Sequence, residues 1–398
     1  MASRRRVLIV PPGPQGGVGD AAVTHMLVQE VRAAGVAGVA VVRYAGDEGE
    51  ELWGDAHASS YLAAPSWPFD RARWSGSVLA AALADYDDVV IAGNDCIDGG
   101  YANEGTVALL ECARFAQELG SRVALVNCSF NQRPTSVAVE ALRRLPASIP
   151  VWLRDAISAR SLRAATGRTA YLGAEIAFLV EPRAGDPRGP LEWVRRHAAA
   201  GKRVVVLVPN PMVGTRDPLG APQRDPGPYV AILERLLRLP VGETRVLVAP
   251  NDARPAVGDL ELVDAIAGAL PRACADAVCV SARPLPAALL AETARHAALL
   301  VGARFHAVVM ALVAGTPVVA LEYQDKMRGV LRDCALEDLW VPCAGGLDPG
   351  VIVARAEAAL ARAGAIRGAI AAAVPVLRRR ASAMVADVLA DGGAPFAG

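Results

Sequence analysis

The sequence has no excess of charge of either sign. Its 398 residues include 41 Lys and Arg and 41 Asp and Glu, so the formal net charge is zero. A chain without a positive field has no general attraction for a nucleic acid backbone, and we therefore expect no nucleic-acid partner. The five histidines are scattered along the chain and predict no metal site.

The sequence also lacks paired cysteines and long apolar runs. Its seven cysteines form an odd set without CxxC spacing, which is typical of a reducing compartment. No run approaches the roughly 18 apolar residues of a membrane span, and the run after the basic residues 4–6 is too short for a signal peptide. We expect a cytoplasmic protein. A role of the basic segments 4–6 and 378–380 near an anionic membrane surface stays open.

What the chain does contain is typical of a folded α/β protein. Hydrophobic residues make up 53% and charged residues 21% of the sequence. The chain is longer than one comfortable core, so we expect two domains. Short apolar segments alternate with helical patterns in both halves, which predicts parallel sheets covered on both faces. The expected architecture is two doubly wound, Rossmann-like domains that face each other across a cleft.

The element boundaries follow from this alternation. In the first half we predict strands at 7–10, 39–43, 88–92, 122–127, 150–154 and 169–172, and helices at 21–34, 76–85, 103–119, 134–145 and 156–165. In the second half we predict strands at 203–209, 244–250, 277–280, 298–301 and 318–321, and helices at 190–200, 228–238, 259–269, 286–296, 306–314, 349–363 and 365–391. The proline-rich residues 181–190 are the predicted linker between domains 1–180 and 191–398. The last helix is a candidate to pack back on the first domain.

The segment 298–329 carries the strongest functional signal. Its pattern predicts a strand, a helix and a second strand. Arg304 and His306 stand at the start of the helix, where backbone N–H groups and the helix dipole favour an anion. Glu322, Tyr323 and Lys326 follow the second strand, at the edge of the sheet where α/β folds bind ligands. These residues predict a site for a phosphate or carboxylate beside a proton donor. A set of unrelated surface and helix-start residues is the alternative.

Two further loops follow predicted strands in the first half. The loop at 16–20 contains Gly17 and Gly19, which would allow a close approach of the backbone to a ligand, and Asp20, which can cap a helix. It matches neither GxGxxG nor GxxxxGK[ST], so no nucleotide phosphate site is predicted. In the loop at 93–101, Asn94 and Asp95 could contact the hydroxyl groups of an acceptor, and a carboxylate there could act as a base. A turn with a helix cap is the alternative.

Arg154 and Asp155 stand where a strand ends and a helix begins. Asp155 is a candidate helix cap. Arg154 is predicted to point into the cleft opposite Arg304, so that two arginines could clamp one dianion. A buried ion pair between Arg154 and Asp155 is the alternative.

Taken together, these segments resemble the polysaccharide pyruvyl transferase family. GARFHA at 302–307, AGTPV at 314–318 and YQDKMRG at 323–329 are similar to the family's Arg-Leu-His-Ala, Ala-Gly-x-Pro-Val and Tyr-Asp-x-Lys-x-Arg-Gly. GVGD at 17–20 resembles its Asn-x-Gly-Asp, RDAIS at 154–158 resembles its Arg-Asp-x-x-Ser, and EIAF at 175–178 resembles its Asp-x-Ala-Phe. The matches span nearly the whole chain in the family's order.

The resemblance implies a glycosyltransferase-B-like fold and transfer of a pyruvyl group from phosphoenolpyruvate onto sugar hydroxyls as a ketal. It implies the following roles: catalysis by His306 and Arg304; donor binding by Arg304, Lys326 and Arg154; and an acceptor or cleft side made of Gly17, Gly19, Asp20, Asn94, Asp95, Asp155, Glu322 and Tyr323. Phosphoenolpyruvate is then a co-substrate, the acceptor is a saccharide or glycoconjugate, and no metal or redox cofactor is required.

The chain departs from the family pattern at three places. Gly93-Asn94-Asp95-Cys96 stands where the family often has a run of glycines, Glu175 replaces an aspartate and Phe305 replaces a leucine. The first departure leaves the class of acceptor open. Two other functions stay open beside the pyruvyl transferase: a nucleotide-sugar glycosyltransferase or epimerase of the same fold, and a catalytically inactive member that binds a glycan. The sequence predicts no oligomeric state.

Overall fold

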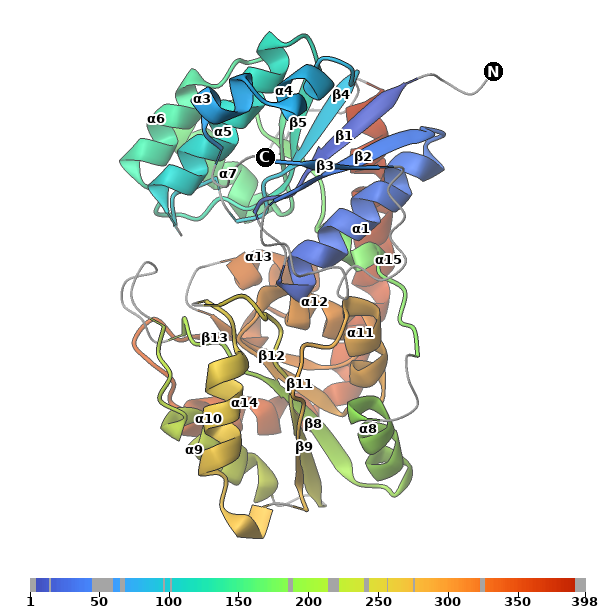
Figure 1. The fold of residues 1–398 in the computed structure, drawn as a ribbon. Helices are drawn as coiled ribbons and strands as arrows, with labels where there is room; N and C mark the ends of the chain where they lie inside the picture. Colours follow the sequence, from blue (N-terminus) through green and yellow to red (C-terminus); the bar gives the residue numbers. More distant parts are fainter. Residues whose placement is uncertain are drawn as a thin grey trace. The chain divides into compact units, whose positions relative to one another are not determined.

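The computed structural model describes residues 5–13, 16–44, 60–64, 69–95, 97–100, 102–184, 189–213, 222–239, 243–255, 257–274, 276–322 and 326–390. The chain divides into two compact units (Figure 1). Unit 1 takes in Met1–Gln15, Asp20–Leu179 and Val376–Gly398, and unit 2 takes in Gly16–Gly19 and Val180–Pro375. The main division therefore falls between Leu179 and Val180, at the start of the predicted linker. The glycine loop 16–19 groups with unit 2, which the sequence did not predict.

Unit 1 contains one parallel sheet in the order β3-β2-β1-β4-β5-β6-β7. The strands are β1 Arg6–Val10, β2 Gly38–Arg43, β3 Ser60–Ala63, β4 Asp88–Ala92, β5 Arg122–Cys128, β6 Val151–Leu153 and β7 Tyr171–Leu172. The helices are α1 Val18–Ala33, α3 Arg71–Ser75, α4 Val78–Leu83, α5 Asn103–Glu118, α6 Ser136–Arg144 and α7 Ala156–Thr166. Strand β3 was not predicted because four residues give too short a pattern. The helix predicted at 76–85 corresponds to α4, and α3 was not predicted.

The core of unit 1 lies between this sheet and one layer of helices. Alternate strand residues such as Leu8, Ile91 and Leu125 are fully buried there, against residues of α4, α5, α6 and α7. Figure 1 shows α3, α4, α5 and α6 gathered on one side of the sheet and α1 on the other. Each fully buried Leu or Ile contributes about 1.5–3 kcal/mol of transfer free energy. The sheet is therefore held rigidly, and the loops at its carboxyl edge start from fixed points.

Unit 2 contains a second parallel sheet, in the order β10-β9-β8-β11-β12-β13. The strands are β8 Arg203–Val208, β9 Thr244–Val248, β10 Val278–Val280, β11 Leu299–Gly302, β12 Val318–Glu322 and β13 Trp340–Pro342. The helices are α8 Pro190–Ala199, α9 Gly227–Leu237, α10 Leu260–Ala269, α11 Ala287–Arg295, α12 Phe305–Val313, α13 Lys326–Asp333, α14 Pro349–Ala361 and α15 Ala363–Leu389. Figure 1 shows α9 and α10 on one side of the sheet, and α8 and α11 on the other.

Both sheets confirm the predicted doubly wound, Rossmann-like class. In each, the strand order reverses between the first strand and the fourth: between β1 and β4 in unit 1, and between β8 and β11 in unit 2. Ligands of open α/β sheets bind at this switch point, outside the carboxyl ends of the strands. The sequence analysis missed α13 and β13. The latter is an edge strand that ends in Pro342, which an edge tolerates because no neighbouring strand needs its missing N–H.

The last helix, α15, belongs to both units. The division of the chain falls inside it, between Pro375 and Val376, and the residues after this point group with unit 1. There, Arg122 donates a hydrogen bond of 3.4 Å to the Leu389 carbonyl. A Cβ placed on Gly173 would overlap the side chain of Met384, so this part of α15 lies directly against the loop after β7. The C-terminal segment is thus part of the unit 1 fold.

Several absences hold within the described part of the chain. No single helix there has the length and hydropathy to cross a membrane, although α14 and α15, bent by 80° at their junction, pass that test as a pair. No group of three or more His, Cys, Asp or Glu residues there could hold a metal ion. Of the basic residues at the N-terminus, Arg5 pairs with Asp88 at 2.5 Å and Arg6 with Asp85 at 3.6 Å.

Candidate functional site

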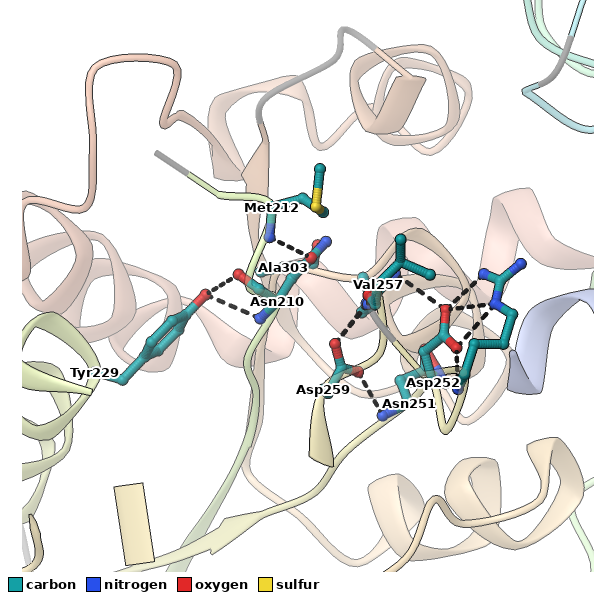
Figure 2. Close-up of polar contacts among 10 residues, drawn as sticks. Asn210, Met212, Tyr229, Asn251, Asp252, Val257, Asp259 and Ala303 are labelled. Atoms are coloured by element: carbon teal, nitrogen blue, oxygen red, sulfur yellow. Dashed lines mark hydrogen bonds and ion pairs between the residues drawn. The ribbon is translucent and has the colours of Figure 1, made fainter. Parts of the chain in front are cut away.

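The candidate site lies in unit 2, at the switch point between β8 and β11. Asn210 follows β8, and its side-chain Nδ2 donates a hydrogen bond of 2.9 Å to the carbonyl of Ala303, which follows β11. The Asn210 Oδ1 accepts from the Met212 N–H at 2.9 Å. The Tyr229 hydroxyl accepts from the Asn210 N–H at 3.0 Å and donates to the Asn210 carbonyl at 3.1 Å (Figure 2). These bonds fix the turn that leads into α12.

Burial keeps the Tyr229 hydroxyl in its protonated form. The side chain is 3% exposed, and this burial raises the pKa of Tyr229 well above its ordinary value. The hydroxyl therefore stays a donor at every physiological pH. The turn before α12 is held by neutral hydrogen bonds that do not titrate.

Helix α12 begins beside this turn with its first N–H groups uncapped by a side chain. Arg304 occupies the N-cap position with an extended backbone (φ −112°, ψ 127°) and makes no side-chain cap hydrogen bond. The first turn of a helix leaves up to four N–H groups without an intrahelical partner and carries a partial positive charge. The start of α12 therefore carries N–H groups that a side chain does not cap, and the anion site expected there stays a prediction.

The Arg304 side chain faces two buried carboxylates. Its Nε and Nη2 donate to Oδ1 of Asp259 at 2.9 and 2.6 Å, and Nη2 also donates to the Val257 carbonyl at 2.8 Å. Its Nη1 lies 3.4 Å from Oδ2 of Asp252. The side chains of Arg304, Asp252 and Asp259 are 15%, 3% and 0% exposed. Arg304 thus joins the turn before α12 to the 251–259 segment that connects β9 to α10.

The two carboxylates differ in their charged partners. Asp252 pairs with Arg254, whose Nη2 lies 2.5 Å from Oδ2. Burial would raise the pKa of Asp252, but Arg304 and Arg254 together hold it below its ordinary value. Asp259 accepts from the Asn251 N–H at 2.8 Å and from Arg304. Burial raises the pKa of Asp259 to about 6, although Arg304 opposes the shift.

The glycine loop 16–19 lies on this same segment. Gly17 forms an antiparallel bridge with Asp252, the Val18 N–H donates to the Asn251 carbonyl at 3.0 Å, and the Ala253 N–H donates to the Gly16 carbonyl at 2.9 Å. Gly16 has φ 144°, a conformation that favours glycine. Gly17, which was predicted for the acceptor side, is therefore part of a backbone bridge within unit 2.

His306 lies where two helices begin. It stands in the first turn of α12 and is half-buried. Gly19 stands in the first turn of α1, and a Cβ on Gly19 would overlap the His306 ring at Nδ1. The imidazole therefore lies against the backbone of the α1 N-terminus. An imidazole that adjoins two positive helix ends is well placed to hold and move a proton next to a bound anion.

Glu322 and Lys326 stand on either side of the loop after β12, where Tyr323 lies outside the described residues. Glu322 is 2% exposed and accepts from Trp340 Nε1 at 2.6 Å, from the Arg328 N–H at 3.1 Å and from the Met327 N–H. The structure thus uses Glu322 to cap α13 instead of presenting it to an acceptor. Burial raises the pKa of Glu322 to about 7. Lys326 is the first residue of α13 and is half-buried.

Unit 1 has its own polar network at the carboxyl ends of β4 and β5. Asn94 and Asn127 both have positive φ, 41° and 58°, and both are at most 2% exposed. Asn127 Nδ2 donates to Asn94 Oδ1 at 3.0 Å, and Asn94 Nδ2 donates to Oδ1 of Asp20 at 2.8 Å. Such a backbone costs free energy in any residue but glycine and persists only where the surroundings fix it. The network holds Asp20, a predicted acceptor-side residue, at this edge.

Arg154 lies inside this network. It is 1% exposed, with Nη1 2.7 Å from Oε2 of Glu175 and Nε 2.5 Å from the Ser129 hydroxyl. The prediction of an arginine that points into a cleft therefore differs from the structure, because a buried guanidinium needs a buried carboxylate. The predicted alternative partner, Asp155, is also not the one used. Asp155 is 1% exposed and caps α7 by accepting from the Ser158 N–H at 2.8 Å.

Hydrogen bonds to a buried carboxylate, Asp98, hold the loop after β4. Asp95 is half-buried. Asp98 is 4% exposed and accepts from the Gly100 N–H at 2.8 Å and the Asn131 N–H at 3.0 Å. Asp98 therefore shapes the loop instead of serving as an exposed base, and Cys96 lies outside the described residues.

Sequence reasoning missed several residues that build these sites. They are Asn210, Tyr229, Asp252, Arg254 and Asp259 in unit 2, and Asn127 in unit 1. A signal existed for some of them, because Asn210 and Asp252 follow predicted strands within a few residues. The signal was incomplete because strand order, which decides which strand ends adjoin, cannot be taken from the pattern alone.

The fold is similar to that of several solved structures. S. aureus MnaA in a co-structure with UDP is 13% identical, covers 97% of this chain and 96% of its own, and gives a TM-score of 0.62. A UDP-GlcNAc 2-epimerase from Neisseria meningitidis bound to UDP-GlcNAc is 14% identical, and the match covers 97% of this chain and 100% of the epimerase chain with a TM-score of 0.57. Trehalose-6-phosphate synthase OtsA is 14% identical, and the match covers 98% of this chain and 100% of the OtsA chain with a TM-score of 0.59. The curated proteins include no match to the sequence.

The two parallel sheets and these neighbours define a glycosyltransferase-B-like protein of two Rossmann-like domains. Within that class, the family model of polysaccharide pyruvyl transferase matches residues 18–325. The chain belongs to the polysaccharide pyruvyl transferase family, and the resemblance found in its motifs is confirmed.

The buried pair of Arg154 and Glu175 generates a prediction about stability. Glu175→Ala leaves a buried guanidinium without its carboxylate and should lower the free energy of unfolding by about 3–5 kcal/mol. Glu140→Ala is the matched control, because its pair with Arg144 is exposed on α6 and should cost less than about 1 kcal/mol. Urea unfolding measures both. Equal losses would show that the Arg154 pair does not stabilise unit 1.

The contact between Gly19 and His306 predicts a coupling. Gly19→Ala should lower the free energy of unfolding by about 1–3 kcal/mol, because the new methyl group overlaps the imidazole. In a His306→Ala background the same change should be nearly neutral. Gly105→Ala on α5 is the control, since a Cβ there meets nothing within 4 Å. A double-mutant cycle with no coupling would contradict the contact.

The buried Glu322 predicts a pH-dependent stability. Its pKa is raised from 4.5 to about 7 in the folded protein, so the folded state binds more protons than the unfolded state between these values. Its contribution is present in full below about pH 4.5 and is lost as the pH rises through 7, on the order of 3 kcal/mol in total. Urea unfolding at pH 5 and pH 8 should show this loss in the wild type and a smaller one in Glu322→Gln. The same loss in both would contradict it.

Proposed function

We propose that this protein transfers the pyruvyl group of phosphoenolpyruvate onto hydroxyl groups of a saccharide or glycoconjugate. The observation that carries the proposal is the position of His306, which lies against Gly19 where α1 and α12 begin, in a chain of the polysaccharide pyruvyl transferase family. This arrangement supplies a titratable ring beside two positive helix ends.

The donor suits such a site. Phosphoenolpyruvate carries a phosphate and a carboxylate, and both anions would be stabilised by the helix starts and by Lys326 at the start of α13. Arg304 is the further predicted donor ligand, and its guanidinium is held by Asp259 in the structure. We propose that Lys326 and the α12 N-terminus make the first contacts to the donor.

The proposed reaction removes a proton from each of two sugar hydroxyls and delivers one proton to carbon and one to the departing phosphate. His306 donates a proton to the methylene carbon of phosphoenolpyruvate, which becomes a methyl group and leaves a cationic centre at C2. A sugar hydroxyl then forms the O–C2 bond and returns a proton to His306. The C2–O bond to phosphate breaks as a second hydroxyl closes the ketal, and the proton of this second hydroxyl goes to the departing phosphate. Proton transfer of this kind contributes about 10² to 10⁴ in rate. The scheme uses no metal or redox cofactor.

For the acceptor we propose the carboxyl edge of unit 1. Asp20, fixed by Asn94, and the half-buried Asp95 offer carboxylate oxygens of the kind that bind sugar hydroxyls. Asp155 and Glu322 are occupied as helix caps, so we assign them a supporting role in place of direct contact.

Calorimetry of phosphoenolpyruvate binding tests the donor half of the proposal. The wild type should bind it saturably. His306→Ala and Lys326→Ala should weaken binding about tenfold or more, since each removes a polar or charged contact to the anion. The chain's other lysine gives the control: Lys202 lies at the amino end of β8, and Lys202→Ala should leave the affinity unchanged.

The same titration separates the alternatives. UDP-GlcNAc is the comparison ligand, because two structural neighbours were solved with UDP or UDP-GlcNAc. Binding of UDP-GlcNAc without binding of phosphoenolpyruvate would reject the proposal and favour a nucleotide-sugar enzyme. Binding of neither, with saturable binding of a glycan, would favour an inactive glycan-binding protein.

A further inference from the structure

The contact between Arg304 and Asp259 is close but one-sided. Both guanidinium nitrogens that reach Asp259, Nε at 2.9 Å and Nη2 at 2.6 Å, contact the same oxygen, Oδ1. The other oxygen, Oδ2, accepts from the backbone N–H of Asn251. The strongest arginine–carboxylate pairs use two parallel hydrogen bonds to two oxygens. The geometry leaves Arg304 able to exchange this partner for another anion.

Among the described residues, Arg304 pairs with two carboxylates, and one of them, Asp252, has Arg254 as a second partner. Arg254 neutralises Asp252 through contacts as short as 2.5 Å, and Arg304 neutralises Asp259. An anion that arrives at the start of α12 therefore finds no surplus positive charge on this arginine. It has to compete with Asp259 for the guanidinium, which stands at the N-cap position of that helix.

We propose that Asp259 sets the affinity of the donor site by competing with a bound phosphate or carboxylate for the guanidinium of Arg304. The inference rests on the proposed function, since it assigns an anionic donor to the start of α12. Donor binding then draws Arg304 away from Asp259. A carboxylate left buried without its partner is stable only in its neutral form, so anion binding takes up a proton at Asp259.

The pH dependence follows from this linkage. The pKa of Asp259 is raised to about 6 by burial while Arg304 still pairs with it. Among the described residues, the charged and titratable groups that interact with Asp259 are Arg304 from the turn before α12, Asp252 from the 251–259 segment and Tyr229 from α9, while Arg254 pairs with Asp252. Below pH 6 a neutral Asp259 no longer competes, and above it the carboxylate does. The phosphate group itself also titrates near this range, so only the comparison of two proteins isolates Asp259.

The experiment compares the wild type with Asp259→Asn, which keeps the size and removes the charge. Asp264→Asn is the matched control, because Asp264 is an exposed carboxylate on the same helix, α10. Each protein is titrated by calorimetry with phosphoenolpyruvate and separately with inorganic phosphate, at pH 5 and at pH 8. At pH 8, Asp259→Asn should bind about tenfold more tightly than the wild type, which corresponds to about 1.4 kcal/mol. At pH 5 the ratio should approach one, and Asp264→Asn should match the wild type at both.

The outcomes distinguish this inference from the proposed function. Equal or weaker binding by Asp259→Asn at pH 8 would overturn the inference and make Asp259 a residue that only positions Arg304. A tenfold ratio with phosphate, without any binding of phosphoenolpyruvate, would uphold competition and reject the proposed donor. No binding of either anion by any of the proteins would overturn both. If Asp259→Asn does not fold, as judged by its thermal transition, Asp259→Ser keeps an acceptor for the Asn251 N–H and takes its place.

Discussion

The ion pairs of Arg304 with Asp259 and Asp252 are the interaction on which the candidate site of unit 2 depends. They join the turn before α12 to the segment between β9 and α10. That segment in turn carries the backbone bridge to Gly17 and the hydrogen bond to Val18. Without these ion pairs, the 251–259 segment, which holds Gly17 and Val18, would no longer be joined to the turn that leads into α12 and His306. Breaking these ion pairs is costly because Asp252 and Asp259 are 3% and 0% exposed, and leaving such a buried charge without a partner would cost several kcal/mol.

Unit 1 also buries polar groups at the carboxyl edge of its sheet, but it pairs them through a different set of residues. Two asparagines in left-handed backbone conformations, together with Glu175 and Arg154, fill the carboxyl edge with mutually satisfied donors and acceptors. In the centre of this network the guanidinium of Arg154 is paired with the carboxylate of Glu175. The edge is therefore rigid, and Asp20 and Asp95 are the carboxylates at its less buried margin. A rigid edge with a few half-buried carboxylates is suited to a neutral ligand rich in hydroxyl groups.

Much of this fold could be predicted from the sequence because its parallel strands are short apolar runs with clear ends. The strand at 88–92 was predicted to the residue, and the helix at 103–119 to within one. The elements that were missed, β3, α3, α13 and β13, are short or rich in polar residues. The start of α12 could be located from the sequence because Arg304 and His306 lie in one local pattern.

The partners of these residues could not be predicted because they come from distant parts of the chain. Asp259 contacts Arg304 because the strand order places β9, β8 and β11 side by side. Gly19 contacts His306, and the residues just before it are held on the 251–253 segment by backbone hydrogen bonds. The burial of individual charged residues could not be predicted from the sequence either. Arg154 was expected to face a ligand, and nothing local indicated that Glu175 would hold it inside the unit. Local patterns thus locate a site, while the charge balance within it depends on the tertiary fold.

The most direct test of the account is phosphate release from phosphoenolpyruvate in the presence of a panel of saccharide acceptors, compared between the wild type and His306→Ala. The account predicts release that depends on an acceptor, matched by pyruvyl groups on the sugar in equal amount, and lost in the variant. Release that is unchanged in His306→Ala, or no release with any acceptor, would contradict it.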